Sequence, residues 1–548
     1  MLSTARRKTG RREKESGDMS PHSINRTTEV ELNNERELFM DYLMGIDLGS
    51  TNLKAVIYDP SGNAVASGSR KTELFHLDDD HPEWACWKPE QIWGGTADAI
   101  AEAVAKIDEP KAVRAVAVTG MGMDGVPIDE NGNWLYPFIS WHDPRTGPQL
   151  QWWKDNIGAE KSFAIGGNPL WHINSALRIL WMAEHEPEIL RRTDKWLLIE
   201  DFLNFMLCGC RTTDYSMASN TLLFDQHKLN WSDEMLTASG IDRRLLCEAA
   251  PSTTRLGEIH AEAAKRTGLA EGTPVILGGH DHICGTLPVG AFRPGVVLDV
   301  VGTWESVQIA MAEPRLTDAL RETGMMVQAH VARGRYAVSG TNPSAGMLEW
   351  YRGQYGQEAR RSAEQSGDNE WDHLMAVAAA SPPGARRVMF LPHMSGANCP
   401  VLDDRSLGAF VGLSNIATSG DVLRAIIEGL NYQFLDIVTA VENSTGTKAE
   451  KFIGVGGVTR NQFWMQNKAD MVGRPIEVPA VEEATPLGAA ILAGIGVGLY
   501  EDADDAFERV RKPGKTYEPN LELSKQYAEW FKIYRQLYPA IGPISHQL

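Results

Sequence analysis

The stretch GIDLGSTNLKAVIYD, residues 45–59, has the pattern of two short strands joined by a polar turn. Apolar residues lead up to Asp47, a run of glycine and small polar residues occupies positions 49–52, and apolar residues return from Leu53. Short apolar runs on either side of a Gly/Ser/Thr/Asn cluster are typical of a β-hairpin. The stretch therefore predicts two paired strands near the start of the folded part of the chain.

The turn of this hairpin has two interpretations. In the first it only reverses the chain, as most polar hairpin turns do. In the second its backbone N–H groups and side chains surround phosphate oxygens, without the G-x-x-x-x-G-K-[ST] pattern of a P-loop. The second interpretation assigns phosphate contacts to Ser50, Thr51, Asn52 and Lys54. It also places Asp47 where a carboxylate could hold Mg²⁺.

A second segment repeats this layout about 250 residues later. In GVVLDVVGTWESVQIAM, residues 295–311, apolar residues run into Gly302 and Thr303 and then return. Two similar hairpins indicate two related halves of the chain. Gly302 and Thr303 are then candidates for contact with the same phosphates from the opposite side.

A third segment, KFIGVGGVTRNQFWMQNKADMVGRPIEVP, spans residues 451–479. A strand pattern runs into Gly456 and Gly457, and a helical pattern follows Asn461. Glycines allow a flat ring to lie against the backbone, and Asn461 could form a hydrogen bond with it. By itself a Gly-Gly pair before a helix is usually only a turn.

The octapeptide GGHDHICG, residues 278–285, follows an apolar run and places Asp281 between two histidines. An aspartate after a strand is most often a cap or a turn acceptor. The same residues also fit a catalytic carboxylate, or a histidine pair that binds a metal. On the residues alone, all three alternatives remain open.

The rest of the chain predicts layered α/β structure. Residues 113–141 read as strand, loop, strand and turn, and residues 188–209 read as one amphipathic helix. Beyond residue 340, helical patterns alternate with strand patterns, which favours α/β domains. A chain of 548 residues exceeds the size of one hydrophobic core, and we expect a boundary near residues 290–295.

Composition excludes several classes of function. The formal net charge of -19 argues against binding to nucleic acid or to an anionic membrane surface, because both need a cationic protein face. No apolar stretch approaches the roughly 20 residues of a membrane-spanning helix. The six cysteines are scattered, which is typical of reduced thiols in a cytoplasmic protein. Residues 1–41 predict either a disordered leader or a start assigned too far upstream, and we assign them no function.

Taken in order, these motifs resemble the FGGY carbohydrate kinases. The resemblance covers about residues 43–500, and its order is far more specific than any single member. It rests on the two phosphate hairpins, the adenosine motif at 451–479, GGHDHICG, ISWHDPRT at 139–146 and TTDYSMASNTLLFD at 212–225. In SALRILWMAEH, residues 175–185, Arg178 replaces the lysine that this family usually has.

The resemblance implies an α/β fold of two actin-like (ribonuclease H-like) domains with a central nucleotide and sugar cleft. It divides the chain into a sugar-binding domain at 42–293, an ATP-binding domain at 294–510 and a helical tail at 511–548. ATP and Mg²⁺ are the implied cofactors, with Asp47 and Asp281 near the metal. It further implies that Asp281 is the general base, that His280 donates a hydrogen bond to the sugar, and that Asp124, His282 and Trp84 are further substrate contacts.

The implied activity is transfer of the γ-phosphate of ATP to a primary hydroxyl of a small ketose, deoxyketose or polyol. The loop GMDGVPIDENGNW and the His-Asp pair are most similar to the fuculokinase and rhamnulokinase branch. The alternative is a catalytically silent sugar- and nucleotide-binding regulator of the same fold. Members of this family are frequently dimers, so the resemblance allows a homodimer and leaves the oligomeric state open. We expect a cytoplasmic protein that binds a small-molecule sugar or polyol, and neither nucleic acid nor a membrane.

Overall fold

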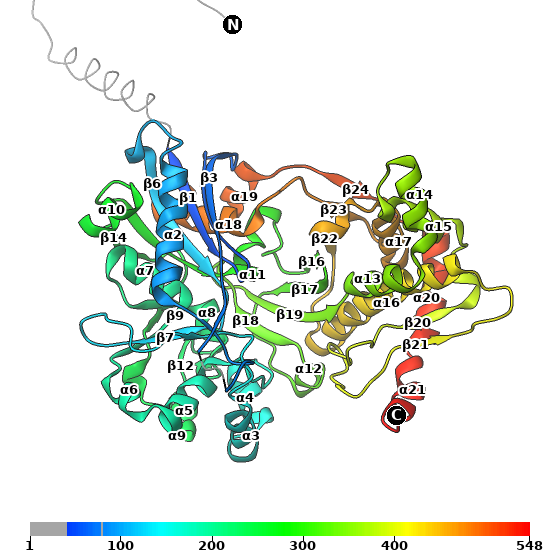
Figure 1. Cartoon of the computed structure of the whole chain (residues 1–548), viewed down its shortest axis with the longest axis horizontal. Coiled ribbons are helices and arrows are strands. Elements are labelled where there is room, and N and C mark those ends of the chain that lie inside the picture. The colour runs from blue at the N-terminus through cyan, green and yellow to red at the C-terminus, as the bar shows by residue number, and fades with distance from the viewer. Residues whose placement is uncertain (1–40, 78–79) are drawn as a thin grey trace, which may run out of the picture. The chain divides into compact units, whose positions relative to one another are not determined.

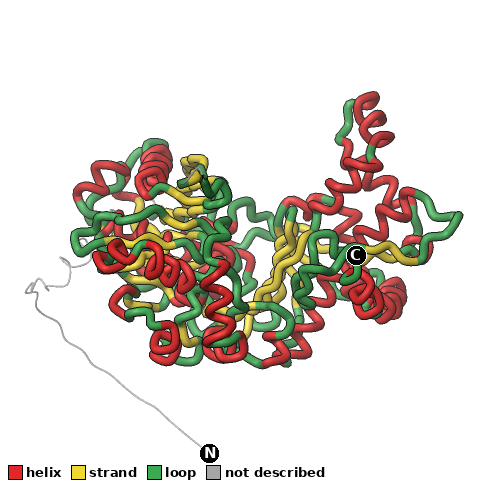
Figure 2. The backbone as a smooth tube through the Cα atoms, turned by 60° about the horizontal axis from the view of Figure 1, so that its bottom comes forward, coloured by secondary structure: helices red, strands yellow, loops and turns green. Residues whose placement is uncertain are grey.

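The computed structural model describes residues 41–77 and 80–548. The expectation for a disordered leader or upstream start at 1–41 falls, apart from its last residue, outside these ranges. Residues Tyr42–Leu548 form one compact unit. Figure 1 and Figure 2 show two groups of strands within this unit, each surrounded by helices. We call them the first and second lobes.

The first lobe contains a six-stranded sheet in the order β14-β15-β6-β1-β2-β3. Strands β1, β2 and β3 form an antiparallel meander, while β6 runs parallel to β1, and β15 runs parallel to β6. The strands are β1 Tyr42–Leu48, β2 Asn52–Tyr58, β3 Ala64–Lys71, β6 Val113–Gly120, β14 Arg255–Glu258 and β15 Pro274–His280. Both strands of the hairpin predicted at 45–59 are therefore present, as β1 and β2.

The second lobe repeats this plan in a seven-stranded sheet, β18-β19-β17-β16-β22-β23-β24. Here β16, β17 and β19 form the antiparallel meander, and β22 and β23 follow in parallel. The strands are β16 Val296–Val301, β17 Trp304–Met311, β18 Met326–Ala329, β19 Tyr336–Pro343, β22 Lys451–Val455, β23 Ile476–Val478 and β24 Lys515–Tyr517. The second predicted hairpin thus occupies the same place in its sheet as the first.

Short strands complete the two lobes. They are β4 Phe75–His76, β5 Ala85–Trp87, β7 Gly125–Ile128, β8 Phe138–Ile139, β9 Lys195–Leu198, β10 Thr212–Asp214, β11 Phe224–Asp225, β12 Asn230–Trp231, β13 Glu248–Ala250, β20 Met389–Leu391 and β21 Ala409–Val411.

Helices of the first lobe are α2 Pro89–Val104, α3 Gly147–Asn156, α4 Ala159–Gly166, α5 Ser175–His185, α6 Pro187–Arg192, α7 Ile199–Cys208, α8 Tyr215–Ser219, α9 Asp233–Ser239, α10 Ala261–Thr267 and α11 Asp281–Cys284. Those that follow are α12 Asp318–Arg321, α13 Gly346–Tyr355, α14 Gln357–Ser366, α15 Glu370–Ala380, α16 Ser419–Thr445, α17 Gln462–Val472, α18 Ala484–Gly496, α19 Ala503–Val510, α20 Leu521–Tyr534 and α21 Leu537–Ser545. Of the described residues, none belongs to a helix long and apolar enough to cross a membrane.

Helix α18 lies in sequence between β23 and β24 of the second sheet but packs against β1, β6 and β15 of the first lobe. Figure 1 shows it among the strands of that lobe. The approach is so close that a Cβ atom on Gly45 would lie 1.8 Å from the carbonyl oxygen of Pro486. Glycine is required here because any side chain would separate helix and sheet. The chain therefore returns to the first lobe after building most of the second.

The prediction of one helix over residues 188–209 is wrong. The structure has a helix, a strand and a second helix there: α6, β9 and α7. Residues Lys195–Leu198 pair antiparallel with Gly125–Ile128. Pairing with a strand some 70 positions away overrides the local helical periodicity, because strand formation depends on a partner.

Candidate functional site

The carboxyl ends of the parallel strands bring Asp47 and Asp281 together. Asp47 in β1 and Gly279 in β15 both align with Thr119 of the intervening strand β6. Asp281 follows two positions after Gly279, as the first residue of α11. Ligands of open α/β sheets bind at such strand ends. Two carboxylates that are distant in sequence thus meet at one edge of the first sheet.

The environment of Asp47 disfavours its charged form. Burial raises the pKa of Asp47 from 3.8 to about 8, the negative charges of Asp281 and Glu483 add to this rise, and Lys54 opposes it. Like charges this close cannot both ionise freely. A cation bound by both carboxylates would remove this repulsion.

Lys54 already has an anionic partner. Its ammonium group donates to both carboxylate oxygens of Glu483, at 2.7 and 2.9 Å. Glu483 is the residue that precedes α18, and its side chain is 44% exposed. Lys54, for which the sequence predicts a phosphate contact, therefore pairs here with an acid 429 positions away.

The first turn presents its small polar residues to the outside of the sheet. The turn is closed by a hydrogen bond from the Gly49 amide to the Asn52 carbonyl, at 3.1 Å. The neighbouring strand supports it, since the Thr72 hydroxyl donates to the Gly49 carbonyl. Thr51 and Asn52 are exposed, and Ser50 is half-buried.

A chain of hydrogen bonds orients the ring of His280. Asn220 donates from its amide nitrogen to the Ser216 carbonyl, so its oxygen accepts from the Gln328 amide, at 2.7 Å. The Gln328 oxygen then faces His280 Nδ1 at 3.2 Å. Burial lowers the pKa of His280 to about 4, which leaves the ring neutral near pH 7. Nδ1 is therefore the donor, and Nε2 offers an acceptor rather than the donor expected from the sequence.

Asp281 lies between His280 and His282. Its Oδ1 accepts a hydrogen bond from the backbone amide of His282 at 2.6 Å and lies 3.4 Å from His280 Nε2. The His282 ring is more exposed than either neighbour, and its Nε2 lies 3.8 Å from the same oxygen. The Asp281 side chain is 22% exposed, so it is partly screened but still reachable.

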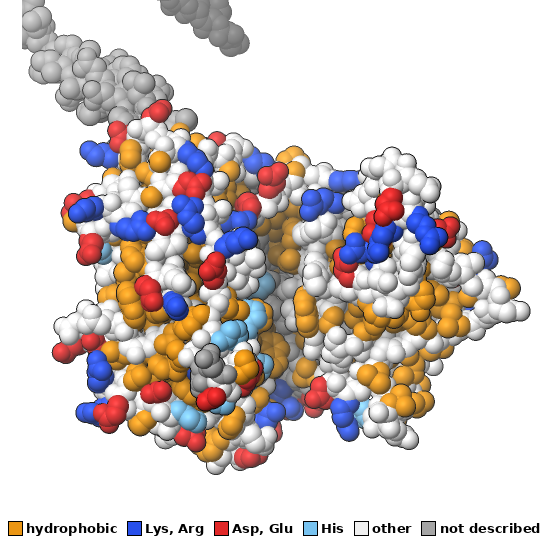
Figure 3. Space-filling view, in the orientation of Figure 1, with side chains coloured by type: hydrophobic (Ala, Val, Ile, Leu, Met, Phe, Trp, Pro, Cys, Tyr) orange, Lys and Arg blue, Asp and Glu red, His pale blue; other side chains and the backbone are white. Residues whose placement is uncertain are grey.

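A cavity of about 300 Å³ opens beside Asp281 and is bordered by both lobes. Figure 3 shows a hollow on this face between the lobes, with histidine side chains at its edge. Ser50, His280, Asp281 and His282 line this cavity, which we call the cleft cavity. Its remaining walls are apolar in the first lobe and mainly polar in the second: Met121, Gly122, Met123, Trp141, Trp171 and Ile173, then Ser306, Gln308, Met326, Gln328, Ser339, Gly340, Thr341 and Cys399.

Asp124 is fully buried next to this cavity's wall. Its Oδ2 accepts from the indole N–H of Trp87 at 2.7 Å, and its Oδ1 lies 3.2 Å from Arg178. Burial raises the pKa of Asp124 to about 6, although Arg178 and Trp87 both lower it. Arg178 also donates to the carbonyl of Met123, which lines the cleft cavity. The residue that departs from the family pattern thus supports the loop in front of the cavity.

Trp84 belongs to a stack of aromatic and cationic side chains. Its ring lies parallel to that of His81, with centroids 4.0 Å apart, and the guanidinium of Arg145 lies 4.3 Å from its centroid. Arg145 is also held by a buried ion pair with Asp143, at 2.7 Å. In the described parts of the chain, Trp84, Asp124 and Lys54 line neither the cleft cavity nor the larger cavity in the second lobe.

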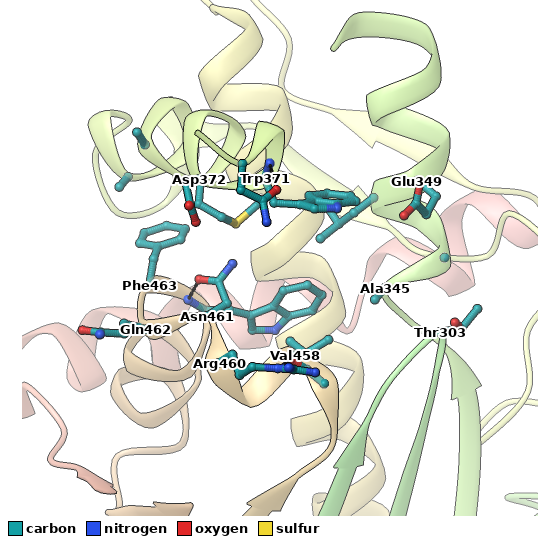
Figure 4. Close-up of a pocket in the computed structure, with 18 residues that line it drawn as sticks. Thr303, Ala345, Glu349, Trp371, Asp372, Val458, Arg460, Asn461, Gln462 and Phe463 are labelled. Carbon is teal, nitrogen blue, oxygen red and sulfur yellow. Dashed lines mark hydrogen bonds between the residues drawn. The ribbon is translucent and has the colours of Figure 1, made fainter. Parts of the chain in front are cut away.

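That larger cavity has a volume of about 760 Å³ and is lined by Thr303, Gly457 and Asn461. We call it the adenosine cavity, after the motif at 451–479 that the resemblance assigns to adenosine. Figure 4 shows Trp371 and Asp372 of α15 on one side and the loop before α17 on the other. Asn461 caps α17, since its side chain accepts from the Trp464 amide at 3.1 Å. Neither Trp371 nor its helix was singled out from the sequence, because no motif marks residues that reach the site from a separate helix.

The two loops that border this cavity touch each other. Gly456 has a φ of 98°, a conformation that favours glycine. A Cβ atom there would lie 2.5 Å from the carbonyl oxygen of Val301, directly before Gly302 and Thr303. The Gly302 amide donates to the Trp304 carbonyl at 2.9 Å and closes the second turn. The loop 456–461, which we call the adenosine loop after its motif, and the turn at Gly302 and Thr303 are therefore in contact.

The site suits a metal ion whose remaining ligands are phosphate oxygens and water. Among residues 41–77 and 80–548, no group of three or more His, Cys, Asp or Glu side chains could hold a metal ion. Asp47 and Asp281 form a pair of carboxylates, and Mg²⁺ is commonly bound by one or two carboxylates together with phosphates and water. The two residues therefore fit Mg²⁺ bound to a nucleotide.

Comparison with known proteins agrees with this geometry. Residues 42–288 match the N-terminal domain of the FGGY family of carbohydrate kinases, and residues 298–497 match its C-terminal domain. A xylulose kinase of Lactococcus lactis is 30% identical over 93% of this chain and 99% of its own. An L-fuculokinase of Escherichia coli is 29% identical over 88% of this chain and 98% of its own.

A solved structure confirms the predicted fold class. The xylulose kinase from Rhodospirillum rubrum superposes with a TM-score of 0.83 at 28% identity, over 92% of this chain and all of the other. The α/β fold of two actin-like domains, expected from the motifs, is thus the observed one.

Proposed function

The chain belongs to the FGGY family of carbohydrate kinases, and on that premise we propose that it transfers the γ-phosphate of ATP to a primary hydroxyl of a small ketose, deoxyketose or polyol. It is a carbohydrate kinase, and sugar kinases of this family use ATP. The finer statements concern the sugar, the metal and the role of each residue. The observation that carries them is the position of Asp281, at the start of α11 and on the wall of a cavity bordered by both lobes.

In this proposal Asp281 is the general base. Phosphoryl transfer to an alcohol needs the hydroxyl in line with the γ-phosphorus and an acceptor for the hydroxyl proton. A sugar in the cleft cavity places a hydroxyl beside the Asp281 carboxylate, which takes the proton as the new O–P bond forms. His280 Nε2, fixed as an acceptor by Gln328, takes a hydrogen bond from a neighbouring sugar hydroxyl.

The nucleotide is proposed to lie across the two turns. Thr303, Gly457 and Asn461 border the adenosine cavity, which takes the adenosine part of ATP. Ser50, Thr51 and Asn52 would contact the phosphates from the first lobe, and Gly302 and Thr303 from the second. Lys54 would reach the phosphates only by leaving Glu483. We therefore propose that the main effect of Lys54 is to lower the pKa of Asp47 and so to favour its charged form.

Asp47 and Asp281 are the residues that would hold Mg²⁺. The metal would supply charge neutralisation for the transferred phosphoryl group. The repulsion that raises the pKa of Asp47 supports this assignment, since a cation removes its cause. Closure of the lobes over both substrates would exclude water from the transfer.

The substrate contacts proposed for Asp124, Trp84 and His282 have unequal support. His282 lines the cleft cavity. Asp124 is bound by Trp87 and Arg178, so direct contact with a sugar would require the loop 121–124 to move. Trp84 would act through Arg145 rather than by stacking on the sugar.

Apolar residues on the first-lobe wall of the cleft cavity support a deoxyketose over a fully hydroxylated sugar. The side chains of Met121, Met123, Trp141, Trp171 and Ile173 offer no hydrogen-bonding partner of ordinary strength except two indole N–H groups. A methyl or methylene carbon fits such a wall, whereas a hydroxyl placed there would lose its hydrogen bonds to water. Substrates of the fuculose and rhamnulose type are therefore proposed before xylulose.

The sheets support a division into domains at about residues 293 and 294, with the exception of α18. All strands of the first sheet precede residue 281, and all strands of the second follow residue 295. We propose that residues 484–496, although in the range assigned to the ATP-binding domain, move with the first lobe. A cytoplasmic location, where ATP is supplied, and a homodimer remain proposals that fractionation and sedimentation would test.

A substrate panel tests the function. Purified protein with ATP and Mg²⁺ is assayed for ADP release in the presence of fuculose, rhamnulose, xylulose, ribulose and glycerol, with Asp281→Asn as matched control. We expect sugar-dependent ADP release with a higher kcat/KM for the deoxyketoses. Sugar binding measured by calorimetry without any turnover would instead favour the silent regulatory protein.

A further inference from the structure

A buried lysine joins the two loops that border the adenosine cavity. Lys468 lies in α17, and its ammonium group forms ion pairs with Asp299 of β16, at 2.6 Å, and with Glu305 of β17. All three side chains are at most 2% exposed. The same ammonium lies 4.3 Å from the ring centroid of Phe434 in α16. No solvent therefore competes for these contacts.

The sheet explains why one lysine reaches both acids. Val301 pairs with Glu305 in the antiparallel ladder of β16 and β17. Side chains two positions apart on a strand share a face, so Asp299 and Glu305 are diagonal neighbours on one face of the sheet. They stand on opposite arms of the hairpin whose turn is Gly302 and Thr303. The ammonium group thus bridges the two arms three residues before and two residues after that turn.

Lys468 itself belongs to the helix that directly follows the adenosine loop. Helix α17 begins directly after Asn461, its cap, and the preceding Gly457 lines the adenosine cavity. Lys468 lies within this helix, about two turns from its start. The loop touches the hairpin a second time where Gly456 packs against the Val301 carbonyl. Two contacts, one backbone and one ionic, therefore relate the phosphate turn to the adenosine loop.

The two acidic partners of Lys468 keep its ammonium group charged. Burial alone would lower the pKa of Lys468, but Asp299 and Glu305 outweigh it and hold the pKa above its ordinary value. Burial raises the pKa of Asp299, against the effect of the lysine. Removing the lysine would leave two acids without their cation in a dry environment, which is costly.

We propose that Lys468 is a positioning residue that sets the spacing between the phosphate turn 302–303 and the adenosine loop 456–461. This role rests on the proposed nucleotide site. It predicts that Lys468 matters only for ligands that span both loops. ATP and ADP carry the phosphates proposed to contact Gly302 and Thr303, whereas adenosine has no phosphate to place there, although Thr303 also borders its cavity.

Nucleotide binding without sugar tests this role. Calorimetry is carried out with ATP, ADP and adenosine on the wild type, on Lys468→Met and on Lys451→Met. Lys451 is a matched control because it pairs with Glu477 at 2.8 Å in the same sheet but is 45% exposed. We expect Lys468→Met to weaken ATP and ADP binding about tenfold or more, the affinity equivalent of one or two hydrogen bonds lost between the phosphates and a displaced turn. Adenosine binding should change less than about twofold, because adenosine makes no phosphate contacts.

Two results would overturn the positioning role. Unchanged ATP binding in a folded Lys468→Met variant would do so, and so would equal losses for ATP and adenosine, which indicate general damage to the lobe. If Lys468→Met does not fold, Glu305→Gln and Asp299→Asn each loosen one arm of the hairpin without leaving an unpaired pair of acids. Both variants are expected to weaken ATP binding more than adenosine binding, as Lys468→Met does. If neither variant does so, the positioning role is overturned. A wild type that binds no nucleotide refutes the nucleotide site itself.

Discussion

Lys54 and Glu483 are 429 positions apart, and the lysine ammonium donates to both oxygens of the glutamate. The pair ties the first phosphate hairpin to the start of α18. Because Lys54 lowers the pKa of Asp47 and Glu483 raises it, the pair also sets the charge of the carboxylate proposed to hold Mg²⁺. The interaction thereby couples a packing contact to the electrostatics of the site.

Glu483→Gln is expected to move the pH dependence of nucleotide binding to lower pH. The change removes a negative charge that raises the pKa of Asp47 and releases Lys54 toward that carboxylate. The measurement is the affinity for ATP with Mg²⁺ between pH 6 and pH 9. Glu482→Gln serves as control, since Glu482 is the exposed neighbour. An identical pH profile for Glu483→Gln and the wild type would contradict this coupling.

Asp47→Asn is expected to stabilise the free protein while weakening binding of ATP with Mg²⁺. The pKa of Asp47 is about 8 in the folded protein and 3.8 as an ordinary carboxyl, so the folded state holds a proton that the unfolded chain has lost at intermediate pH. The contribution of Asp47 to stability therefore falls as pH rises from about 4 to about 8. Thermal unfolding should show a higher melting temperature for Asp47→Asn than for the wild type, with a difference that grows from pH 5 to pH 8. A gain independent of pH would point to another cause.

Asp281→Asn is expected to lower kcat by about 10²- to 10⁴-fold, the usual contribution of a general base. Binding of ATP measured without Mg²⁺ should survive, because the substitution keeps the shape of the side chain and removes a charge that opposes Asp47. Stopped-flow measurement of ADP formation checks kcat, and calorimetry checks binding. His282→Gln is the companion variant, since this exposed side chain lies next to the same carboxylate. Equal losses of kcat in both variants would remove the special role of Asp281.

Arg178→Met is expected to destabilise the protein by about 3–5 kcal/mol, because it leaves the buried Asp124 carboxylate without its cation. Arg178→Lys keeps the charge but gives up contact with either Asp124 or the Met123 carbonyl, for a loss of about 1–3 kcal/mol. Urea unfolding measures both. The double variant Arg178→Met with Asp124→Asn should recover part of the loss. A larger loss in the double variant than in Arg178→Met would argue against the ion pair as the cause.

Local patterns predicted the elements whose residues interact with near neighbours. Both phosphate hairpins formed as expected, since a turn and its two flanking strands lie within about 15 residues. The long helix α16 also follows its apolar periodicity, with Thr418 and Asp421 capping its start. The error at residues 188–209 arose where β9 depends on β7 for its hydrogen bonds.

Several candidate site residues near strand ends line a cavity, whereas Gly302 and Gly456, directly after β16 and β22, line neither of the two cavities described above. Ser50, His280, Asp281 and His282 line one cavity, and Thr303, Gly457 and Asn461 line the other. The partners of the remaining residues could not be anticipated. Trp87 donates to Asp124, whereas Trp84 packs between His81 and Arg145, and no spacing in HPEWACW, residues 81–87, assigns these partners.

The order of motifs in the sequence determined the family and the α/β class through the resemblance that it carries. The two hairpins followed from short segments, because their backbone conformation depends on their own glycines and apolar residues. Only the tertiary structure decided which charges meet: Lys54 with Glu483, Arg178 with Asp124, and Lys468 with Asp299 and Glu305. Ion pairs depend on distances of a few ångströms between side chains from separate elements. Those distances exist only after both sheets and the returning helix α18 have packed.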